Sequence, residues 1–322
     1  MLDGLRIAHL SDLHLGVPGR GRKAVADAVE WVGERKPDLV CITGDLVSRR
    51  SGVAELERLL ARLGRCYVVL GNHDFADSRD PFSQRIDGDA LDGVPGVTLL
   101  TDESITIEAR GRRVQIVGVD PRTYARRDAR PDELIDESIE LRILLCHFPG
   151  IVRRIPPVFQ LVLSGHLHAG QIVVPYPGGK LRLAHLRARD VEGVYDHGTT
   201  KLHVSPGLGT TFVPFRLFAR PEVTELVIRA RDPRRRRVVR SGSHIAKLVR
   251  FAERNASVVL LRYGHALAAQ TPLPGGTSTS SATRGAMALG VLPQWASVPA
   301  EGDRALSVNL LVGLGDMRVD ET

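Results

Sequence analysis

Residues 5–14 read Leu5-Arg6-Ile7-Ala8-His9-Leu10-Ser11-Asp12-Leu13-His14, an apolar run that leads directly into an Asp-x-His pair. Such a run, followed at once by polar residues, is typical of a buried strand that ends at a loop. Side chains two residues apart lie on the same side of an extended chain, so Asp12 and His14 can face one ligand together. The pair would occur by chance in most chains of this length, so it indicates a site only in combination with other motifs.

Four further apolar runs also end in residues of the types that bind metals. Their motifs are Gly44-Asp45, Gly71-Asn72-His73-Asp74, Cys146-His147 and Gly165-His166-Leu167-His168-Ala169-Gly170-Gln171. In α/β sheets the strand ends form the functional edge, because the loops that follow them can converge on one point. The donors are carboxylate, amide and imidazole groups, a mixture that suits Mn²⁺, Fe or Zn²⁺ better than Ca²⁺ or a structural zinc ion.

Seven residues are candidate metal ligands, namely Asp12, His14, Asp45, Asn72, His147, His166 and His168. Seven ligands are too many for one tetrahedral ion and fit two divalent metal ions, with one carboxylate bridging them. Two metals about 3.5–4 Å apart can activate a water and stabilise the attacking and leaving oxygens of a phosphoryl group. The motifs therefore predict a dinuclear centre for phosphoester hydrolysis.

The rest of residues 1–230 alternates short apolar runs with stretches that are compatible with helix. Strands are expected at residues 5–10, 38–43, 66–70, 97–100, 104–108, 114–119, 142–146, 160–163, 171–174, 201–204 and 223–229, and helices at residues 23–35, 53–63 and 131–138. The opening order of strand, helix, strand, helix, strand indicates βαβ units and an α/β fold with a mixed sheet. From residue 97 the strands follow each other more closely, which favours antiparallel pairing.

The formal net charge of +7 comes from one short segment. Residues 231–254 contain nine Lys and Arg residues and two acidic residues, so they account for the whole excess. The body of the chain is nearly neutral, and the basic segment lacks the interleaved aromatic residues that stack on bases, so no specific nucleic-acid partner is expected. The run Arg234-Arg235-Arg236-Arg237 fits a solvated linker, while contact with anionic lipid or non-specific contact with RNA stays open.

Composition divides the chain into two parts. Residues 272–281 (PLPGGTSTSS) are low in complexity, and the apolar stretches after residue 231 are isolated. We therefore expect a catalytic domain at residues 1–230 and a basic, low-complexity, largely disordered C-terminal appendage at residues 231–322.

The expected location is cytoplasmic, because the chain has no apolar stretch of the roughly 18 residues that a membrane span needs and no signal-peptide pattern. Cys41, Cys66 and Cys146 each lie within an apolar run, which favours reduced, buried thiols over a redox or nucleophilic role. The histidines outside the motifs are expected to have ordinary structural or surface roles; they are His9, His185, His197, His203, His244 and His265.

In this order and spacing the motifs resemble those of the calcineurin-like metallophosphoesterase superfamily, whose pattern is D-x-H, GD, GNH[DE], H and GHxH. The resemblance covers about residues 5–230 and implies a four-layer α/β/β/α sandwich with a dinuclear metal centre. The implied ligands are Asp12, His14 and His168 for one metal and Asn72, His147 and His166 for the other, with Asp45 bridging the two. The resemblance also implies that His73 protonates the leaving group or steadies the transition-state charge, and that Asp74 orients His73.

Two segments indicate a branch of this superfamily. Residues 165–171 and 206–229 resemble the bacterial membrane-associated branch, which includes relatives described as UDP-2,3-diacylglucosamine hydrolases and lipid phosphodiesterases. The resemblance implies a lipid-linked phosphodiester or pyrophosphate substrate. Together with the phenylalanines and arginines at residues 212–220 and the arginine run at 234–237, it predicts peripheral contact with an anionic membrane at its inner face. The chain departs from the branch in lacking an N-terminal anchor or export signal, and in having Leu167 and Ala169 where a small residue such as Thr and a Gly are usual.

Two questions stay open at the level of sequence. Phe212, Phe215 and Phe218 crowd into seven residues, which favours a turn that packs into the core; with Arg216 and Arg220 beside them, a lipid-entry surface is the alternative. The alternatives to a lipid phosphoesterase are a soluble nucleotide or cyclic-nucleotide phosphodiesterase and, more remotely, a non-catalytic scaffold. A scaffold would be expected to have lost ligands, and here every ligand position is filled.

Overall fold

The computed structural model describes residues 2–17, 19, 21–75, 83–84, 91, 94–177, 179–185 and 188–229, together with strands at residues 257–265, 297–300, 304–313 and 317–319. Its helices are α1 (Gly21–Arg35), α2 (Val53–Leu63) and α3 (Pro121–Arg126), with the short 3₁₀ helices η1 (Arg50–Gly52), η2 (His73–Phe75), η4 (Pro131–Leu134), η5 (Pro149–Arg153) and η6 (His168–Gly170). Its strands are β1 (Arg6–Leu10), β2 (Leu39–Thr43), β3 (Cys66–Val69), β4 (Val97–Leu99), β5 (Glu103–Ala109), β6 (Arg112–Gly118), β7 (Leu141–Leu145), β8 (Leu161–Ser164), β9 (Val173–Tyr176), β10 (Gly179–Arg182), β11 (Gly193–His197), β12 (Thr200–Val204), β13 (Glu222–Arg229), β14 (Ser257–His265), β15 (Ser297–Ala300), β16 (Arg304–Gly313) and β17 (Met317–Val319).

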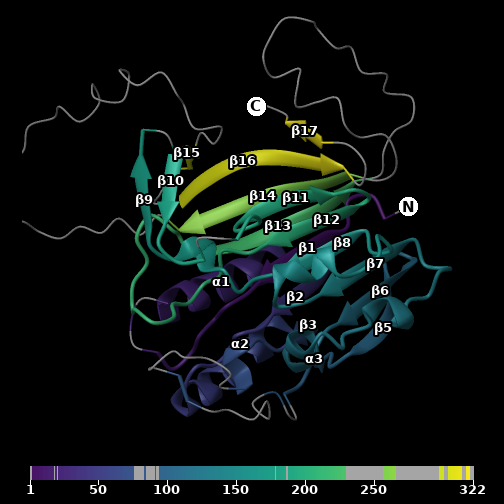
Figure 1. Ribbon diagram of the computed structural model, residues 1–322, viewed down its shortest axis with the longest axis horizontal. Helices are drawn as coiled ribbons and strands as arrows, with labels where there is room; N and C mark the ends of the chain where they lie inside the picture. The colour runs from purple at the N-terminus through teal and green to yellow at the C-terminus, as the bar shows by residue number, and fades with distance from the viewer. Residues whose placement is uncertain are drawn as a thin grey trace, which may run out of the picture.

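The strands of the described chain form two large sheets and one hairpin (Figure 1). The first sheet has the order β15-β16-β14-β13-β1-β2-β3-β4, with β17 paired to β16. Within it β1 to β4 are parallel, whereas β13 runs antiparallel to β1. The second sheet has the order β11-β12-β8-β7-β6-β5, in which the four inner strands are parallel and the two edge strands antiparallel. Strands β9 and β10 form the separate antiparallel hairpin.

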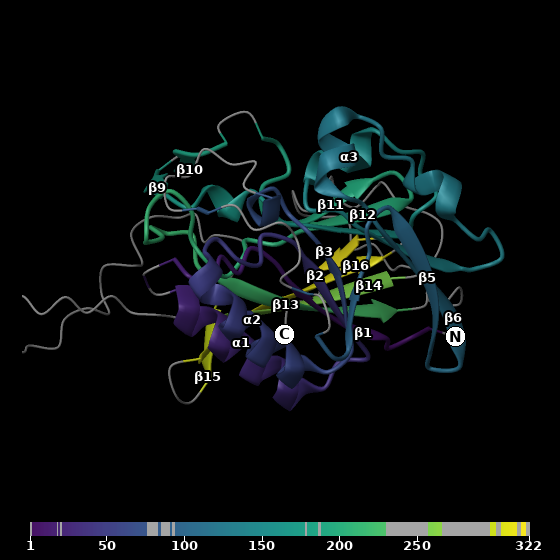
Figure 2. The same ribbon diagram turned by 90° about the horizontal axis from the view of Figure 1, so that it is seen from below.

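Three layers of buried apolar side chains hold these elements together. α1 and α2 pack on the outer face of the first sheet, the two sheets face each other across a second layer, and η5 with part of α3 covers the outer face of the second sheet (Figure 2). Each central strand contributes to two layers, which explains why β2 is buried along its whole length. The predicted α/β class and the four-layer α/β/β/α sandwich are confirmed.

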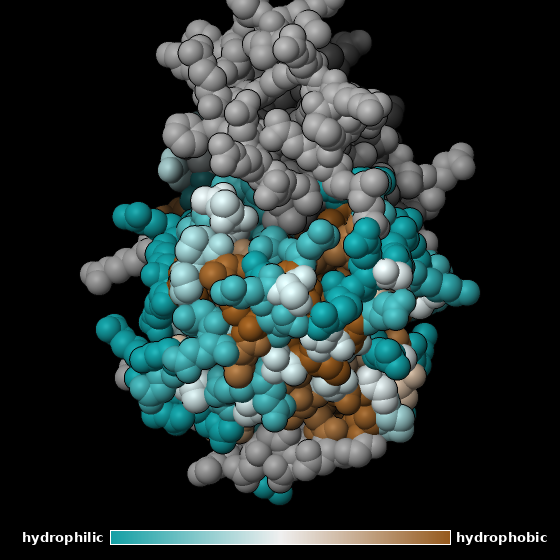
Figure 3. All heavy atoms as spheres, turned by 90° about the vertical axis from the view of Figure 1, so that its right-hand side faces the viewer, coloured by the Kyte–Doolittle hydropathy of each residue, from teal (hydrophilic) through white to brown (hydrophobic). Residues whose placement is uncertain are grey.

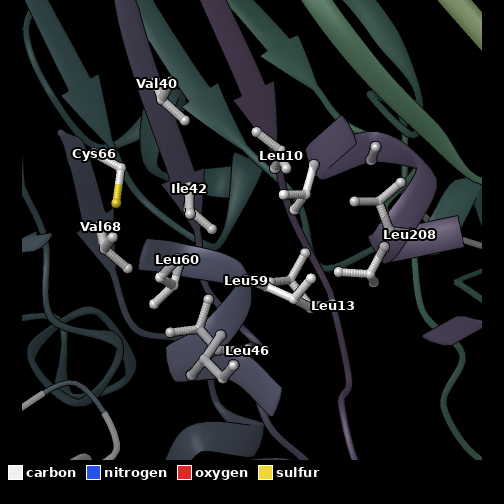
Figure 4. Close-up of a cluster of buried hydrophobic side chains, with 14 of the residues drawn as sticks. Leu10, Leu13, Val40, Ile42, Leu46, Leu59, Leu60, Cys66, Val68 and Leu208 are labelled. Carbon is white, nitrogen blue, oxygen red and sulfur yellow. The ribbon is translucent and has the colours of Figure 1, made fainter. Parts of the chain in front are cut away.

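The layer beneath α1 and α2 anchors the loops that follow the first strands. Leu13 and Leu46, which follow β1 and β2, belong to the same cluster as Leu59 and Leu60 of α2, and Leu208 joins it from a loop far along the chain (Figure 4). Full burial of a leucine contributes roughly 1.5–3 kcal/mol relative to exposure. The polar residues that alternate with these leucines are therefore fixed in position by their apolar neighbours.

One predicted helix is wrong and one helix is missing from the predicted elements. Residues 131–138 form only η4, because the Asp136 carboxylate accepts a hydrogen bond from the Ser138 N–H at 2.9 Å in a turn that competes with helix. Helix α3 is absent from the predicted elements, although the Asp120 side chain caps it and Pro121 occupies its first position. Strands β10 and β11 are likewise absent from them.

The expected antiparallel pairing after residue 97 is wrong for the four inner strands of the second sheet. The connections at residues 119–140 and 146–160 contain short helices and cross from one parallel strand to the next. Cys41, Cys66 and Cys146 are buried and unbonded, as predicted, and burial raises the pKa of Cys66 and of Cys146 to about 12. None of the described helices has the length and apolar character needed to cross a lipid bilayer.

Part of the expected C-terminal appendage forms strands. Strands β14, β16, β15 and β17 extend the first sheet beyond β13. The rest of residues 231–322, including the arginine run at 234–237 and the segment 272–281, lies outside the described residues. The domain boundary at residue 230 and the largely disordered appendage stay predictions.

Leu56 of α2 tests the contribution of the layer beneath the site, because its side chain is completely buried. We expect Leu56→Ala to lower the free energy of unfolding by about 2–5 kcal/mol, as measured by urea denaturation. The matched control is Glu57→Ala, an exposed position on the same helix, for which a change within about 0.5 kcal/mol is expected. Equal destabilisation by both variants would contradict the role of this layer.

Candidate metal centre

The two sheets bring five loops together at the carboxyl ends of their parallel strands. Asp12, Asp45 and Asn72 follow β1, β2 and β3 of the first sheet, and His147 and His166 follow β7 and β8 of the second. Backbone hydrogen bonds join neighbouring loops, from the Asp12 N–H to the Gly44 carbonyl at 2.9 Å and from the Gly165 N–H to the His147 carbonyl at 3.0 Å. Side chains that are far apart in sequence therefore meet in one small volume.

The first group of ligand atoms belongs to Asp12, His14, Asp45 and His168, and these atoms all lie within 4.8 Å of one another. Nε2 of His14 is 3.1 Å from Nε2 of His168 and 3.5 Å from Oδ2 of Asp45. Nε2 of His168 is 3.3 Å from Oδ1 of Asp12. All four residues are buried, so their ligand atoms are shielded from bulk water.

The second group contains Asp45, His147 and His166, also within 4.8 Å. Nε2 of His147 lies 3.3 Å from Oδ2 of Asp45 and 3.2 Å from Nδ1 of His166. Asp45 belongs to both groups and lies where they meet. A carboxylate shared by two groups of ligands can bridge two cations.

Asn72 supplies an independent indication that a cation fits. Its buried Oδ1 atom has no hydrogen-bond partner among the described residues, and such an acceptor costs about 1–3 kcal/mol when it is left unsatisfied. Burial lowers the pKa of His14 to about 3 and lowers the pKa of His166 and of His168 well below the usual value, which keeps these imidazoles neutral, as metal ligation requires. The donor set therefore fits a divalent transition metal ion, such as Mn²⁺.

Hydrogen bonds behind the ligands orient two of the rings. Nδ1 of His147 donates to the Thr43 carbonyl at 2.7 Å, which leaves Nε2 directed toward Asp45. Nδ1 of His14 lies 2.7 Å from Oγ of Ser48, with the same effect. Metal-ligating histidines commonly use their second ring nitrogen in this way.

Asp45 and His147 are electrostatically coupled. Burial acts to raise the pKa of Asp45, but the nearby His147 and His73 lower it well below the usual value. Burial acts to lower the pKa of His147, but Asp45 raises it to about 9. A ligating imidazole must be unprotonated, so a cation at His147 competes with a proton.

The backbone at the site is strained. Positive φ angles occur at Asp12 (53°), His14 (47°), Asp45 (53°), His166 (72°) and His168 (48°). Such conformations cost a non-glycine residue about 1–3 kcal/mol each and cluster at functional sites, where the surroundings fix them. Close packing adds a constraint at Gly71, where a Cβ atom would come within 2.1 Å of Oδ1 of Asp45.

His73 and Asp74 lie at the edge of the two groups. Nε2 of His73 is 3.9 Å from Oδ2 of Asp45, and its Nδ1 is 2.8 Å from Oγ of Ser83. The Asp74 carboxylate accepts hydrogen bonds from the N–H groups of Leu46, Val47 and Gly71 at 2.8, 3.2 and 2.8 Å. Ser83 therefore contacts the His73 ring, and Asp74 ties together the loops after β2 and β3.

Three polar residues beside the site are not among the predicted site residues. Arg216 is partly buried, with Nη2 3.0 Å from Nδ1 of His168; burial lowers its pKa to about 10, so it remains a cation at neutral pH. Gln171 is buried and bonds to the backbone of the loop at residues 211–215. The ring of His185 lies 5.4 Å from that of His166. Arg216 and Gln171 stand within the segments that carry the family resemblance, but only the fold shows their contacts.

The expectation that Phe212, Phe215 and Phe218 pack into the core is wrong, because they are 52%, 52% and 66% exposed. The reason is Gln171, whose Nε2 donates to the backbone carbonyls at residues 211, 213 and 215, so that the loop backbone faces inward. The large exposed hydrophobic residues of the described chain, which we call the apolar rim, are Val174, Tyr176, Leu181, Leu183, Phe212, Phe215, Leu217 and Phe218.

The two segments that carry the apolar rim are neighbours, because the loop at 211–218 is bonded to the start of the hairpin β9–β10 and to the residue before it. The Val173 N–H donates to the Leu217 carbonyl, and the Leu217 N–H donates to the Gln171 carbonyl, both at 2.9 Å. At the opposite end of the molecule, hydrophilic residues are spread among hydrophobic ones (Figure 3). The large exposed hydrophobic residues of the described chain lie on the hairpin and the loop that adjoin the turn of His168, since the Gln171 N–H donates to the His168 carbonyl at 2.8 Å.

The histidines expected to have ordinary roles include a buried pair, His9 and His203, whose Nδ1 atoms lie 2.7 Å apart. His197 lies 3.2 Å from a carboxylate oxygen of Asp190. His244 and the side chain of His265 lie outside the described residues. His185 differs from the expectation in lying against a motif histidine.

Comparison with known proteins agrees with this geometry. Residues 5–170 match the calcineurin-like phosphoesterase family. The chain is similar to the uncharacterized metallophosphoesterase YkoQ of Bacillus subtilis, with 30% identity over 231 residues that cover 68% of this chain and 82% of that protein. It is 28% identical over 230 residues to the phosphodiesterase YaeI of Escherichia coli, covering 69% of this chain and 81% of that one. It is also 33% identical over 252 residues to a Danio rerio transmembrane protein with metallophosphoesterase domain, covering 71% of this chain and 54% of the relative.

The two ligand groups lead to a prediction of metal stoichiometry. We expect chelator-treated protein to bind close to two Mn²⁺ ions per chain, as measured by calorimetry and elemental analysis. A single ion per chain at saturating metal would contradict a bridging role for Asp45 between two cations.

The coupling of Asp45 and His147 leads to a prediction of pH dependence. Because the pKa of His147 is raised to about 9, protons compete with the cation throughout the neutral range. The apparent affinity for Mn²⁺ should therefore fall as pH falls from 8 to 6, by up to about tenfold per pH unit. An affinity independent of pH over this range would show that His147 does not hold the ion.

Proposed function

This chain belongs to the calcineurin-like phosphoesterase family, and we propose that it hydrolyses a phosphodiester or pyrophosphate bond in a lipid-linked substrate such as UDP-2,3-diacylglucosamine. The family and the histidine and aspartate groups make it a metal-dependent phosphoester hydrolase. The observation that carries the substrate proposal is the apolar rim beside His168. The name of the Escherichia coli relative, a phosphodiesterase, supports cleavage of a diester.

We assign one cation to Asp12, His14 and His168 and the other to Asn72, His147 and His166, with Asp45 shared. When bound, two divalent cations would polarise the phosphoryl oxygens and lower the pKa of a water molecule. The contribution of the chain is to hold imidazoles and carboxylates together in a buried site, where electrostatic interactions with a phosphoryl group are stronger than in water.

His73 is the motif histidine that belongs to neither ligand group. Nδ1 of His73 lies 2.8 Å from Oγ of Ser83, and Nε2 of His73 lies 3.9 Å from Oδ2 of Asp45. When the ring is protonated on both nitrogens, Nδ1–H donates to Oγ of Ser83 and the Nε2 proton can be given to the departing oxygen of the substrate, which leaves a neutral imidazole. Asp74 supports this position through the backbone of the loops after β2 and β3.

His73→Ala tests this role. We expect kcat on an aryl phosphodiester to fall by about 10²–10⁴, the range for general acid–base groups, while the metal content is kept. The control is His197→Ala, a histidine outside the site that should leave kcat unchanged. Loss of metal in His73→Ala would instead identify His73 as a ligand.

Peripheral contact with an anionic membrane is part of the proposal. The segments 171–183 and 206–220, which form the apolar rim, contain no acidic residue; they contribute Arg220, together with Lys180 and Arg182, which share an ion pair with Glu192 at 3.6 and 3.2 Å. Arg216 does not add to this attraction, because its guanidinium contacts His168. Cations near an acidic leaflet contribute roughly 1 kcal/mol each, an attraction that salt screens.

The variant Phe212→Ser/Phe215→Ser/Phe218→Ser tests the role of the apolar rim. We expect wild-type protein to sediment with anionic vesicles at low salt, and the triple variant to bind at least about tenfold more weakly, since each buried phenylalanine contributes roughly 1.5–3 kcal/mol. Turnover of the water-soluble bis(p-nitrophenyl) phosphate should be kept, because the metal ligands are untouched. No vesicle binding by wild-type protein, together with faster turnover of a nucleotide substrate, would favour the soluble nucleotide phosphodiesterase.

A further inference from the structure

The guanidinium group of Arg216 joins two turns at the site. Nε donates to the Gly209 carbonyl at 2.8 Å, and Nη1 donates to the carbonyls of Pro206 and His168 at 2.8 and 3.3 Å. Nη2 lies 3.0 Å from Nδ1 of His168, but a ring that binds a cation through Nε2 carries its proton on Nδ1 and cannot accept from Arg216, so Arg216 holds the turns through its three bonds to carbonyl groups. A planar group that donates to three carbonyl groups of two turns is held in one orientation.

The turn that carries His168 is strained and needs support. His168, Ala169 and Gln171 all have positive φ, at 48°, 54° and 48°, although none is glycine. Such backbone persists only where surrounding contacts fix it. The Gln171 side chain fixes the end of the turn through the Thr211 carbonyl at 2.7 Å and the Thr211 N–H at 3.0 Å. The start of the turn, at His168, is held by Arg216.

The second turn, at residues 206–209, backs the Asp-x-His pair. The Gly209 N–H donates to the Asp12 carbonyl at 2.6 Å, and a Cβ atom on Gly209 would lie 2.8 Å from Cβ of His14. This turn therefore lies directly against the segment that follows β1. Arg216 connects that segment to His168, which follows β8 of the other sheet.

We infer that Arg216 is a positioning residue for the first ligand group, which fixes His168 relative to Asp12 and His14. The inference rests on the proposed two-cation site. In the described chain the hydrogen bonds of Arg216 reach neither His147 nor His166. Loss of Arg216 should therefore weaken one cation and leave the other in place.

The test compares three variants of the full chain. Arg216→Met removes the three bonds to carbonyl groups, Arg216→Lys keeps the charge but cannot span both turns, and Arg189→Met is the control at an exposed arginine to which no role is assigned. Mn²⁺ binding to chelator-treated protein is measured by calorimetry, together with the melting temperature and the rate on bis(p-nitrophenyl) phosphate.

We expect Arg216→Met and Arg216→Lys to bind one Mn²⁺ ion with wild-type affinity and the other about 10–100-fold more weakly, the range for residues that support metal ligands. Arg189→Met should match wild type in both affinities.

Other results would reject either the proposed two-cation site or the positioning role of Arg216. Wild-type protein that binds fewer than two ions would reject the proposed two-cation site itself. With two ions in wild type, unchanged affinities in both Arg216 variants, or equal weakening of both ions with a lower melting temperature, would reject the positioning role. Wild-type affinities in Arg216→Lys alone would show that charge and not geometry matters. If Arg216→Met does not fold, Arg216→Lys decides by the same criteria.

Discussion

The polar part of this protein is arranged around one buried negative charge, the carboxylate of Asp45. A buried charge is tolerated only when opposite charge and hydrogen bonds surround it. One oxygen accepts the His73 backbone N–H at 2.8 Å, and the other lies 3.3 Å from His147 and 3.5 Å from His14. These partners come from both sheets, so satisfying Asp45 requires the strand ends of the two sheets to meet. The packing of the two sheets against each other and the arrangement of the site therefore depend on each other.

The site is assembled at a cost in stability that the apolar layers offset. Asp12 and His14 hold left-handed backbone, and the residue between them, Leu13, is buried in the cluster under α2. The same holds after β2, where strained Asp45 is followed by buried Leu46. Burial of each leucine stabilises by roughly as much as the strain beside it costs, each about 1–3 kcal/mol. Alternation of ligand and leucine thus lets a strained loop remain in place.

Much of the fold and the candidate ligand set could be predicted from sequence, because apolar runs mark the buried strands and the motifs follow directly. Contacts that depend on the path of a distant loop could not. Arg216 meets His168 across 48 residues, and nothing local to either indicates the pairing. Three closely spaced phenylalanines are compatible in sequence with a turn that packs into the core and with an exposed loop. The exposed loop forms because Gln171 donates hydrogen bonds to its backbone carbonyls at residues 211, 213 and 215. The predicted helix at 131–138 failed for a local reason, because the Asp136 carboxylate accepts a hydrogen bond from the Ser138 N–H in a turn that competes with helix.

The loop at residues 211–218 has two faces, and this couples the apolar rim to the ligand group. Arg216 points inward to His168, while its neighbours Phe215 and Leu217 are exposed, as expected where successive side chains alternate. Gln171 holds the same loop from within and also belongs to the strained turn that begins at His168. A molecule that presses on Phe215 or Leu217 therefore acts on the segment that positions a ligand. The proposed contact of substrate with the rim would therefore act on the geometry of His168, because one short stretch of backbone carries both.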